Sequence, residues 1–361
     1  AGLFGRWLMR FFETAYPAVE VVGVDAGESE EGKRDFIARC DVVVFSVPIS
    51  VTPAVIAEYA ALLPPRRQPP LWMDVTSLKA PACETLRAAR PAVETVGLHP
   101  MCAPPPTPSM IGRVLVVCDA GPLDAWGSWF DGFLEKMGGR QVRLGALQHD
   151  RLMSLVQAGC HAGWLAQGKL WSQIVPELGG LGQLLAVRTP SFSLLEKAVS
   201  RVLCGNPELY ASIQLANPEV PATLRKLADG LTELADVVSA GDRDALIKDF
   251  FETPRATLGP ELLQEGNADF ERLSNLLGDL SRPNPLVITV VKDAPGTLTN
   301  VLTEFATKGI NLQSIQSVRA QDGSLRFHIC LDRPASNAEV QEVGRALQKK
   351  ELIKLWDSSL R

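Results

Sequence analysis

The residue of this chain that best suits proton chemistry is His99. It is one of only four histidines among 361 residues, and it lies in the stretch GLHPMCAP between Gly97 and Pro100. Histidine changes its charge near neutral pH, binds metals and also fills protein cores. The flanking glycine and prolines predict a turn and a rigid loop, which would hold a proton acceptor still. The alternative is a ring that only hydrogen-bonds a loop carbonyl.

Two further candidates lie in the stretch DVTSLK, ahead of His99 in the chain. Ser77 and Lys79 follow a short apolar run that predicts a buried parallel strand. Ligands gather at the carboxyl ends of such strands, and the Lys79 ammonium would suit a substrate carboxylate. The alternatives are a helix N-cap for Ser77 and a solvated surface position for Lys79.

The first five residues, AGLFG, match part of a dinucleotide-binding turn. Gly2 and Gly5 fit the second and third glycines of GxGxxG, which let the backbone approach a pyrophosphate and the helix pack on a strand. We expect the following helix, GRWLMRFF, to present its N–H groups to phosphates. We also expect the first glycine and the first strand of the fold to lie ahead of Ala1.

An acidic residue supports this interpretation. Asp25 ends the apolar run VEVVGVD, which predicts a strand. An acid roughly 20 residues beyond the glycines accepts hydrogen bonds from the adenosine ribose, and this favours NAD over NADP. The alternative is an N-cap aspartate that opens the turn GESEEGK. Ser46 and Pro48 follow the strand DVVVF, and we expect them to line the NAD site.

Three regions would position these residues. Residues 1–145 alternate short Val-rich strands with helices, which predicts an α/β fold with a Rossmann-like, doubly wound parallel sheet. Residues 146–280 carry apolar residues at helical spacing and predict an all-helical dimerisation domain, because strongly apolar helices in an appended domain often bury a dimer interface. After the linker SRPNP, residues 286–361 read as βαββαβ, which predicts a small open sandwich.

The composition excludes several classes of protein. Apolar residues make up 46% of the chain, so a sizeable core can form. A net charge of −5 argues against binding to nucleic acid or to an anionic membrane. No apolar run approaches the roughly 20 residues that a membrane span needs. Seven scattered cysteines without a CxxC indicate reduced thiols in the cytoplasm, and no spacing suits a metal site.

Several stretches together resemble the prephenate dehydrogenase family, which includes arogenate and cyclohexadienyl dehydrogenases. The matching stretches occur in family order over residues 1–220: AGLFGRWL, DVVVFSVPISVTPAVI, DVTSLK, GLHPM, QHDRLMSLVQAGCHA and SRVLCGNPELYASIQLANP. The stretch KDAPGTLTNVLTEFATKGINLQSIQS looks like an ACT domain, a module that commonly binds amino acids. The chain has HPMCA where many members have HPMFG or HPMAG, which leaves the substrate preference open.

The resemblance implies oxidative decarboxylation of prephenate to 4-hydroxyphenylpyruvate in tyrosine biosynthesis, with NAD accepting a hydride from C4 while the ring carboxylate leaves as CO2. It implies that His99 accepts the proton of the C4 hydroxyl. It also implies that Ser77 contacts both this hydroxyl and His99. It also implies that Arg201, in SRVLCGNPELY, binds the ring carboxylate. The alternative for Arg201 is an exposed helix arginine.

Gln157 and His161 are four residues apart in SLVQAGCHA, which predicts that they share one face of a helix at the substrate cleft. His161 matches a family histidine close to substrate and nicotinamide. The alternative is a buried histidine bonded to a helix carbonyl. We interpret His149 and Asp150, at the start of this helix, as structural, with Asp150 as its cap.

The ACT-like region supplies candidate effector-binding residues. Asp293, Pro295 and Gly296 form the predicted first strand–helix turn, and Asn311 follows the helix. In a dimer of such modules, these turns could hold an amino-acid effector, with tyrosine as the pathway end product. The alternative is a module that only dimerises.

The sequence leaves rival functions open. Arogenate or amino-deoxyprephenate could replace prephenate as the small-molecule substrate. A non-catalytic amino-acid sensor and a hydroxyacid dehydrogenase with the same two-domain plan are the other candidates. We expect the chain to form a homodimer.

Overall fold

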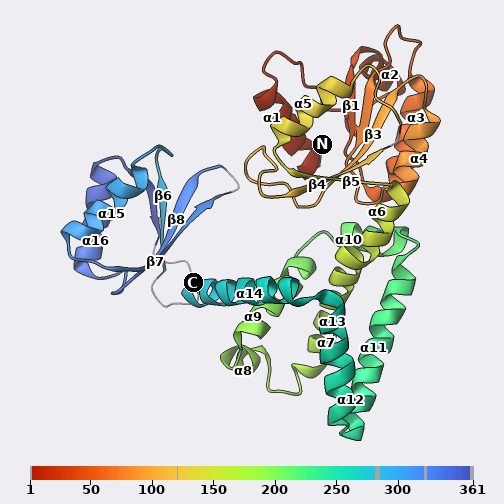
Figure 1. Cartoon of the computed structure of the whole chain (residues 1–361). Coiled ribbons are helices and arrows are strands. Elements are labelled where there is room, and N and C mark those ends of the chain that lie inside the picture. The colour runs from red at the N-terminus through yellow and green to blue at the C-terminus, as the bar shows by residue number, and fades with distance from the viewer. Residues whose placement is uncertain (1, 120, 281–284, 321–322, 358–361) are drawn as a thin grey trace. The chain divides into compact units, whose positions relative to one another are not determined.

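The computed structural model describes residues 2–119, 121–280, 285–320 and 323–357. They form two compact units (Figure 1). The first unit comprises Ala1–Ala186 and Glu196–Leu246, and the second comprises Val187–Leu195 and Ile247–Arg361.

The first unit contains a five-stranded sheet in the order β1 to β5. The strands are β1 (Val42–Phe45), β2 (Leu71–Asp74), β3 (Glu94–Pro100), β4 (Val114–Asp119) and β5 (Arg140–Leu144). All neighbours are parallel except β3 and β4, which are antiparallel. Residues 101–113, which join β3 to β4, contain no helix, and a chain that lacks a crossover helix reverses direction. The predicted Rossmann-like α/β fold is confirmed, with this one antiparallel pair.

Helices cover both faces of the sheet (Figure 1). One face carries α1 (Leu3–Ala15) and α5 (Gly127–Met137), and the other carries α2 (Glu30–Arg39), α3 (Thr52–Leu62) and α4 (Ala80–Ala88). Neighbouring residues of a strand serve opposite faces, as the pleat requires: Met73 packs under α1 and α5, whereas Trp72 packs under α3 and α4.

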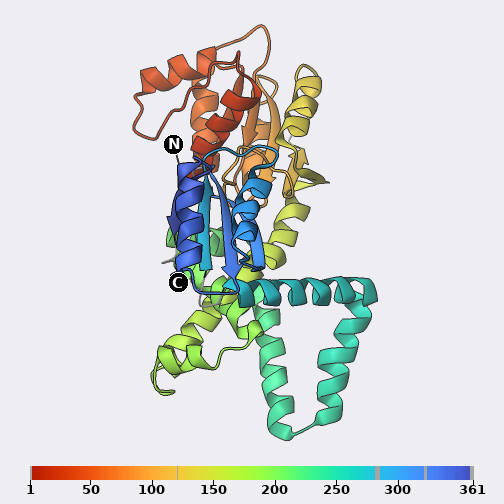
Figure 2. The same ribbon diagram turned by 90° about the vertical axis from the view of Figure 1, so that its left-hand side faces the viewer.

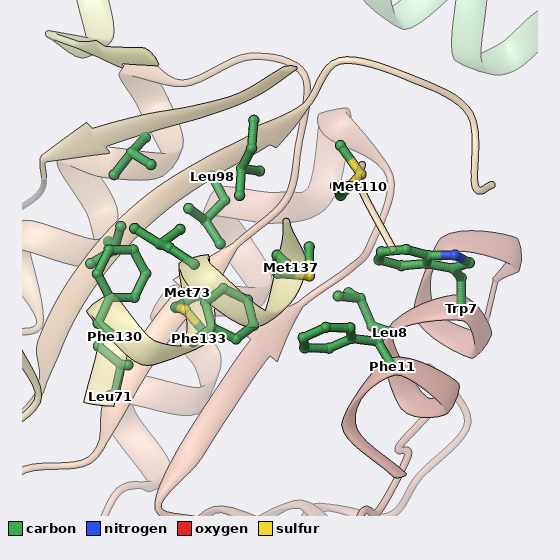
Figure 3. Packing of buried hydrophobic residues seen from close by; sticks show 14 residues of the cluster. Trp7, Leu8, Phe11, Leu71, Met73, Leu98, Met110, Phe130, Phe133 and Met137 are labelled. Carbon is green, nitrogen blue, oxygen red and sulfur yellow. The ribbon is translucent and has the colours of Figure 1, made fainter. Parts of the chain in front are cut away.

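Aromatic side chains fix α1 on the sheet (Figure 3). Trp7 and Phe11 are one helical turn apart and are 0% and 1% exposed. The Phe11 ring meets the ring of Phe133 from α5 edge to face, with centroids 5.6 Å apart. Each such buried side chain contributes about 1.5–3 kcal/mol by leaving water. This packing places the N-terminal end of α1 beside the sheet.

The predicted strand that ends at Asp25 is wrong, because residues 19–25 form no strand. Among the described strands β1 pairs only with β2, so the segment has no neighbour with which to complete a ladder. Asp25 is exposed, and its Oδ1 accepts a hydrogen bond of 2.9 Å from the backbone N–H of Ala26.

Helices follow the sheet, as predicted. They are α6 (Ala146–Met153), a π-helical turn (Ser154–Gly159), α7 (Cys160–Ile174), α8 (Leu181–Ala186), α9 (Pro190–Leu203), α10 (Pro207–Ala216), α11 (Val220–Ala240), α12 (Arg243–Ile247), a second π-helical turn (Lys248–Glu252), α13 (Thr253–Leu258) and α14 (Pro260–Leu280). Within the first unit, Ala158, Ile213 and Val220 pack with Ile49 and Leu78, so the helices share a core with the loops of the sheet.

The second unit ends in a four-stranded antiparallel sheet. Its elements are β6 (Pro285–Val290), α15 (Thr297–Thr307), β7 (Leu312–Arg319), β8 (Leu325–Leu331), α16 (Ala338–Lys349) and β9 (Ile353–Asp357), and the strand order is β7-β8-β6-β9. Both helices lie on the same face of the sheet (Figures 1 and 2). Val301 and Phe305 of α15 and Val343 of α16 share one core with the strands. The predicted βαββαβ order is confirmed.

Within the described residues, none of the helices combines the length and the apolar character that a membrane span needs.

Candidate active site

Two neighbouring parallel strands end at the candidate site. Asp74, the last residue of β2, is in register with Gly97 of β3. Ser77 therefore follows β2 and His99 extends β3 at the same edge of the sheet, where ligands gather in α/β folds. His99 does not lie in a loop as predicted: it is a strand residue paired with Val116 of β4. Pairing with the antiparallel strand β4 continues past Gly97 to Pro100, so the backbone that carries the His99 ring is held in the sheet.

The ring of His99 is the first member of a buried series of hydrogen bonds that also includes His149 and Asp150. Its Nδ1 lies 2.9 Å from Nε2 of His149, and Nδ1 of His149 lies 2.7 Å from Oδ1 of Asp150. His99, His149 and Asp150 are only 3%, 0% and 4% exposed. A strand residue is thus joined to a helix that begins about 50 residues later in the chain.

Asp150 is not the cap of its own helix, which is a correction to the prediction. It lies within α6, and its carboxylate accepts hydrogen bonds from the backbone N–H groups of Lys79, at 2.8 Å, and Ala80, at 2.7 Å. These N–H groups lie at the start of α4, where a helix has unsatisfied donors. The backbone carbonyl of Asp150 accepts a further bond of 2.7 Å from Nδ2 of Asn217.

Burial sets the charge of His99. The pKa of His99 is lowered well below its ordinary value of 6.5, first by desolvation and then by its electrostatic interactions with His149 and Lys79. The ring is therefore neutral near pH 7 and has a lone pair that can take a proton.

The structure does not support Lys79 as a substrate ligand. Its side chain is 0% exposed, it forms an ion pair with Asp74, and its Nζ donates a hydrogen bond of 2.6 Å to the backbone carbonyl of Leu98. A buried ammonium must be paired, and the partners of this one are the Asp74 carboxylate and the Leu98 carbonyl. Lys79 instead ties the loop that carries Ser77 to the strand that carries His99.

A small pocket brings Ser77 together with Gln157. It is lined by residues that follow β1 and β2, by the end of α6 and the π-helical turn, and by α10 and the residue after it: Ile49, Ser77, Leu78, Met153, Gln157, Ser212, Ile213 and Asn217. The π-helical turn contains Gln157, and such turns often occur at functional sites. Because the turn interrupts the regular helix, Gln157 and His161 are not set by ordinary α-helical spacing, and His161 does not line this pocket.

His161 belongs to a second cluster. Its ring meets that of Tyr210 edge to face, with centroids 4.9 Å apart, and its buried Nδ1 has no hydrogen-bond partner among the described residues. The pKa of His161 is lowered by desolvation and then by the positive charge of Arg201. Arg201 is exposed on α9 and does not line the pocket of Ser77. The charge of Arg201 thus acts on His161, and both residues lie outside the pocket of Ser77.

The expected cofactor residues lie at the N-terminal end of α1 and after β1. Gly2 is the N-cap of α1 and has no side chain with which to cap it, and the first turn contains no acid, so the N–H groups suit a phosphate. A Cβ added at Gly2 would meet no atom within 4 Å, which leaves room for a ligand. Gly5 is half-buried in the helix, and Ser46 and Pro48 directly follow β1.

The expected effector residues lie at the surface of the second unit. The carboxylate of Asp293 forms an ion pair with Arg319. Gly296 precedes α15 with φ +87°, a conformation that favours glycine, and Pro295 is exposed beside it. The backbone N–H of Asn311 donates a bond of 3.2 Å to Asp332.

Sequence reasoning missed the roles of His149, Asp150 and Asn217. The signal that could have found them is the pair of polar residues, His149-Asp150, on a helix that otherwise needs apolar residues to pack. Both are almost fully buried, and burial of polar groups requires partners.

Comparisons with known proteins identify the family. Residues 16–140 match the family described as "Prephenate dehydrogenase, nucleotide-binding domain", and residues 146–252 match "Prephenate dehydrogenase, dimerization domain". The predicted nucleotide cofactor agrees with the first of these descriptions.

Similar proteins have related descriptions. A "4-amino-4-deoxyprephenate dehydrogenase" of Streptomyces pristinaespiralis is 31% identical over 76% of this chain and 87% of its own length. A "Probable arogenate/prephenate dehydrogenase" of Methanocaldococcus jannaschii is 26% identical over 68% of this chain, and the "T-protein" of Enterobacter agglomerans is 29% identical over 69%. The chain spans only 56% and 60% of the lengths of these two proteins.

A solved structure shares the fold. The prephenate dehydrogenase from A. aeolicus, in complex with hydroxyphenyl propionate and NAD+, superposes with a TM-score of 0.51 at 15% identity, over 71% of this chain and 94% of that chain. The matched domains and the Streptomyces relative place the chain in the prephenate dehydrogenase family.

Proposed function

We propose that the protein catalyses the NAD-dependent oxidative decarboxylation of prephenate to 4-hydroxyphenylpyruvate. The observation that carries the proposal is His99, a neutral histidine held by a strand and by the chain of His149 and Asp150 at the edge of the sheet where ligands bind. Membership of the prephenate dehydrogenase family supports the same reaction.

In this proposal His99 takes the proton of the C4 hydroxyl of the substrate. The developing carbonyl makes that proton acidic, and a positioned general base contributes about 10²–10⁴ in rate. Ser77, half-buried at the end of the loop after β2, orients the hydroxyl. NAD, when bound, would accept the hydride that leaves C4. Arg201 offers a guanidinium for the ring carboxylate. Desolvation and then the positive charge of Arg201 lower the pKa of His161, which keeps its ring neutral.

The N-terminal end of α1 fits the cofactor. The N–H groups of its first turn and the open space at Gly2 suit a pyrophosphate. Asp25 is exposed and would hydrogen-bond the ribose, which favours NAD over NADP. Gly5, Ser46 and Pro48 complete the proposed cofactor-binding residues.

A homodimer fits the apolar surface of the helical region. Along α11, Leu227, Leu231 and Val238 are 45%, 59% and 61% exposed, and they recur at helical spacing. Exposed apolar stripes of this kind mark association surfaces. The description of residues 146–252 as a dimerization domain supports this assignment.

Regulation by an amino acid is the proposed role of the C-terminal unit. Its βαββαβ order and its two helices on one face are compatible with an ACT domain. The effector, tyrosine, would bind at the turn of Asp293, Pro295 and Gly296 and at Asn311, in a dimer of these units.

A second candidate substrate is 4-amino-4-deoxyprephenate. The relative that carries this name is matched over 87% of its length, more than the arogenate/prephenate relative at 56%. A neutral His99 can accept a proton from an amine as well as from a hydroxyl.

Steady-state assays of NADH formation distinguish these candidates. The full chain is given prephenate, arogenate or 4-amino-4-deoxyprephenate, each with NAD or NADP and with or without tyrosine. The proposal expects the highest kcat/KM for prephenate with NAD, and inhibition by tyrosine. A higher value for the amino compound would select the second candidate, and no turnover of any of the three would refute the proposed function.

A further inference from the structure

We propose that His149 and Asp150 fix the tautomer of His99, so that Nδ1 of His99 carries the proton and Nε2 presents the lone pair. His149 and Asp150 are thus positioning residues that act through His99. The catalytic use of this tautomer rests on the proposed function. The tautomer itself is a property of the protein alone and can be measured without substrate.

Asp150 has a carboxylate that, when ionised, can only accept hydrogen bonds. Its two oxygens receive the backbone N–H groups of Lys79 and Ala80, and Oδ1 also lies 2.7 Å from Nδ1 of His149. The contact with His149 is a hydrogen bond only if Nδ1 of His149 carries a proton. Asp150 therefore determines which nitrogen of His149 is protonated.

The contact between the two rings depends on the same proton. A neutral imidazole carries one proton, so a His149 that is protonated on Nδ1 has an acceptor at Nε2. That Nε2 lies 2.9 Å from Nδ1 of His99. The bond forms only if Nδ1 of His99 donates, and this leaves the lone pair of His99 on Nε2. No described residue forms a hydrogen bond with that Nε2, so its lone pair is not engaged within the described protein.

The surrounding charged groups also favour transfer of the positive charge from His99 to His149. When Nε2 of His99 takes a substrate proton, the ring becomes cationic beside the ammonium of Lys79, which opposes that charge. If the proton on Nδ1 of His99 then moves to Nε2 of His149, His99 is neutral again and the charge lies on His149, in contact with the carboxylate of Asp150. One proton enters at His99 and one moves to His149, so the protons balance. The other charged group at this point is Asp74, which is paired with Lys79.

Imidazole 15N NMR of the full chain tests the tautomer directly, because the chain has only four histidines. Loss of signals in His99→Asn, His149→Gln, His161→Asn and His328→Asn assigns each ring. The proposal expects His99 to be protonated on Nδ1 and unprotonated on Nε2 at pH 7 without substrate. A proton on Nε2 of His99 would overturn it.

Two substitutions of His149 separate positioning from packing. In His149→Gln, the side-chain carbonyl can still accept the proton of Nδ1 of His99, whereas His149→Phe keeps a ring but offers no acceptor. We expect His149→Phe to lower kcat by about 10²-fold or more with little change in KM, as for a base in the wrong tautomer, and to shift His99 toward the Nε2–H form. His149→Gln should retain the Nδ1–H form and recover most of the lost kcat. His328→Asn, on β8 of the second unit, is the matched control and should retain wild-type kcat.

The outcomes distinguish this proposal from the proposed function. A wild-type protein that shows the Nδ1–H tautomer but oxidises none of the three substrates refutes the function and keeps the tautomer proposal. An active protein whose His149→Phe variant keeps wild-type kcat and tautomer, with a native circular dichroism spectrum, refutes the proposal and keeps the function. If His149→Phe fails to fold, the wild-type spectrum and His149→Gln still decide the tautomer.

Discussion

The ammonium group of Lys79 donates a hydrogen bond to the backbone carbonyl of Leu98, with 2.6 Å between nitrogen and oxygen. The loop after β2 is thereby tied to the strand residue that directly precedes His99. The same ammonium neutralises Asp74, which is fully buried. Lys79 thus holds together the two segments that carry Ser77 and His99, although it does not face a substrate.

Lys79→Met tests this tie. The substitution leaves the Asp74 carboxylate buried without its partner, so we expect the free energy of unfolding to fall by about 3–5 kcal/mol. Urea unfolding followed by circular dichroism measures it. The double variant Lys79→Met/Asp74→Leu removes both charges and should recover part of the loss. The control Lys33→Met, at the surface pair with Glu58, should change little. An equal effect of both lysine substitutions would contradict the assigned role.

His99→Asn tests the proton acceptor. Asparagine keeps polar atoms at the site but is not a base, so kcat should fall by about 10²–10⁴-fold. NAD affinity should stay the same, because the cofactor residues lie at α1 and after β1. Stopped-flow NADH formation and the quenching of tryptophan fluorescence by NAD give the two quantities. A variant with unchanged turnover would remove His99 from the proposed mechanism.

Stability should depend on pH through His99. Its pKa in the folded protein is lowered well below 6.5, whereas the unfolded chain has the ordinary value. Between these values the unfolded state binds the extra proton, so stability rises with pH and is lost as pH falls below about 6.5. Urea unfolding of wild type and His99→Asn at pH 5, 6 and 7 measures this. The His99→Asn variant should lose less stability between pH 7 and pH 5 than wild type, and parallel curves would refute this origin.

Arg201→Ala tests the carboxylate ligand. Loss of a charge-assisted hydrogen bond costs about 1.5–3 kcal/mol, so KM for prephenate should rise roughly 10- to 100-fold with a smaller change in kcat. Arg188→Ala is the matched control, because Arg188 is also exposed and is close in sequence, and it should leave KM unchanged. If the two variants have the same KM, then Arg201 is an ordinary surface arginine.

Asp25→Ala tests the cofactor preference. Removal of the carboxylate removes both a ribose acceptor and the repulsion of a 2′-phosphate. The ratio of kcat/KM for NAD to that for NADP should therefore fall, mainly through a higher KM for NAD. Asp41→Ala, at another exposed aspartate of the same unit, serves as the control. An unchanged ratio in Asp25→Ala would exclude the ribose contact.

Local sequence patterns predicted the elements better than the contacts between them. The Val-rich run that became β1 and the apolar run that became β2 are recognisable because burial on both faces demands apolar residues. The same reasoning failed for residues 19–25, since a strand also needs a neighbour with which to pair. It also gave ordinary helical spacing to Gln157 and His161, because no simple residue pattern marks a π-helical turn.

The candidate site was predictable only in part, for a similar reason. His99 and Ser77 stand out as polar residues at the ends of apolar strands. The partner of His99 lies 50 residues away, and only the folded chain shows that His149 and Asp150 turn toward it. Lys79 was placed at the surface or at a substrate because a fully buried lysine is rare unless it is paired.

The carboxylate of Asp150 serves two purposes at once, since it caps the start of α4 and orients His149. Position 150 is therefore expected to tolerate almost no replacement even in a library selected for expression alone. A survey of mutational tolerance would score it as a folding determinant, and its contribution to proton chemistry would emerge only from replacements at its neighbour on the same helix.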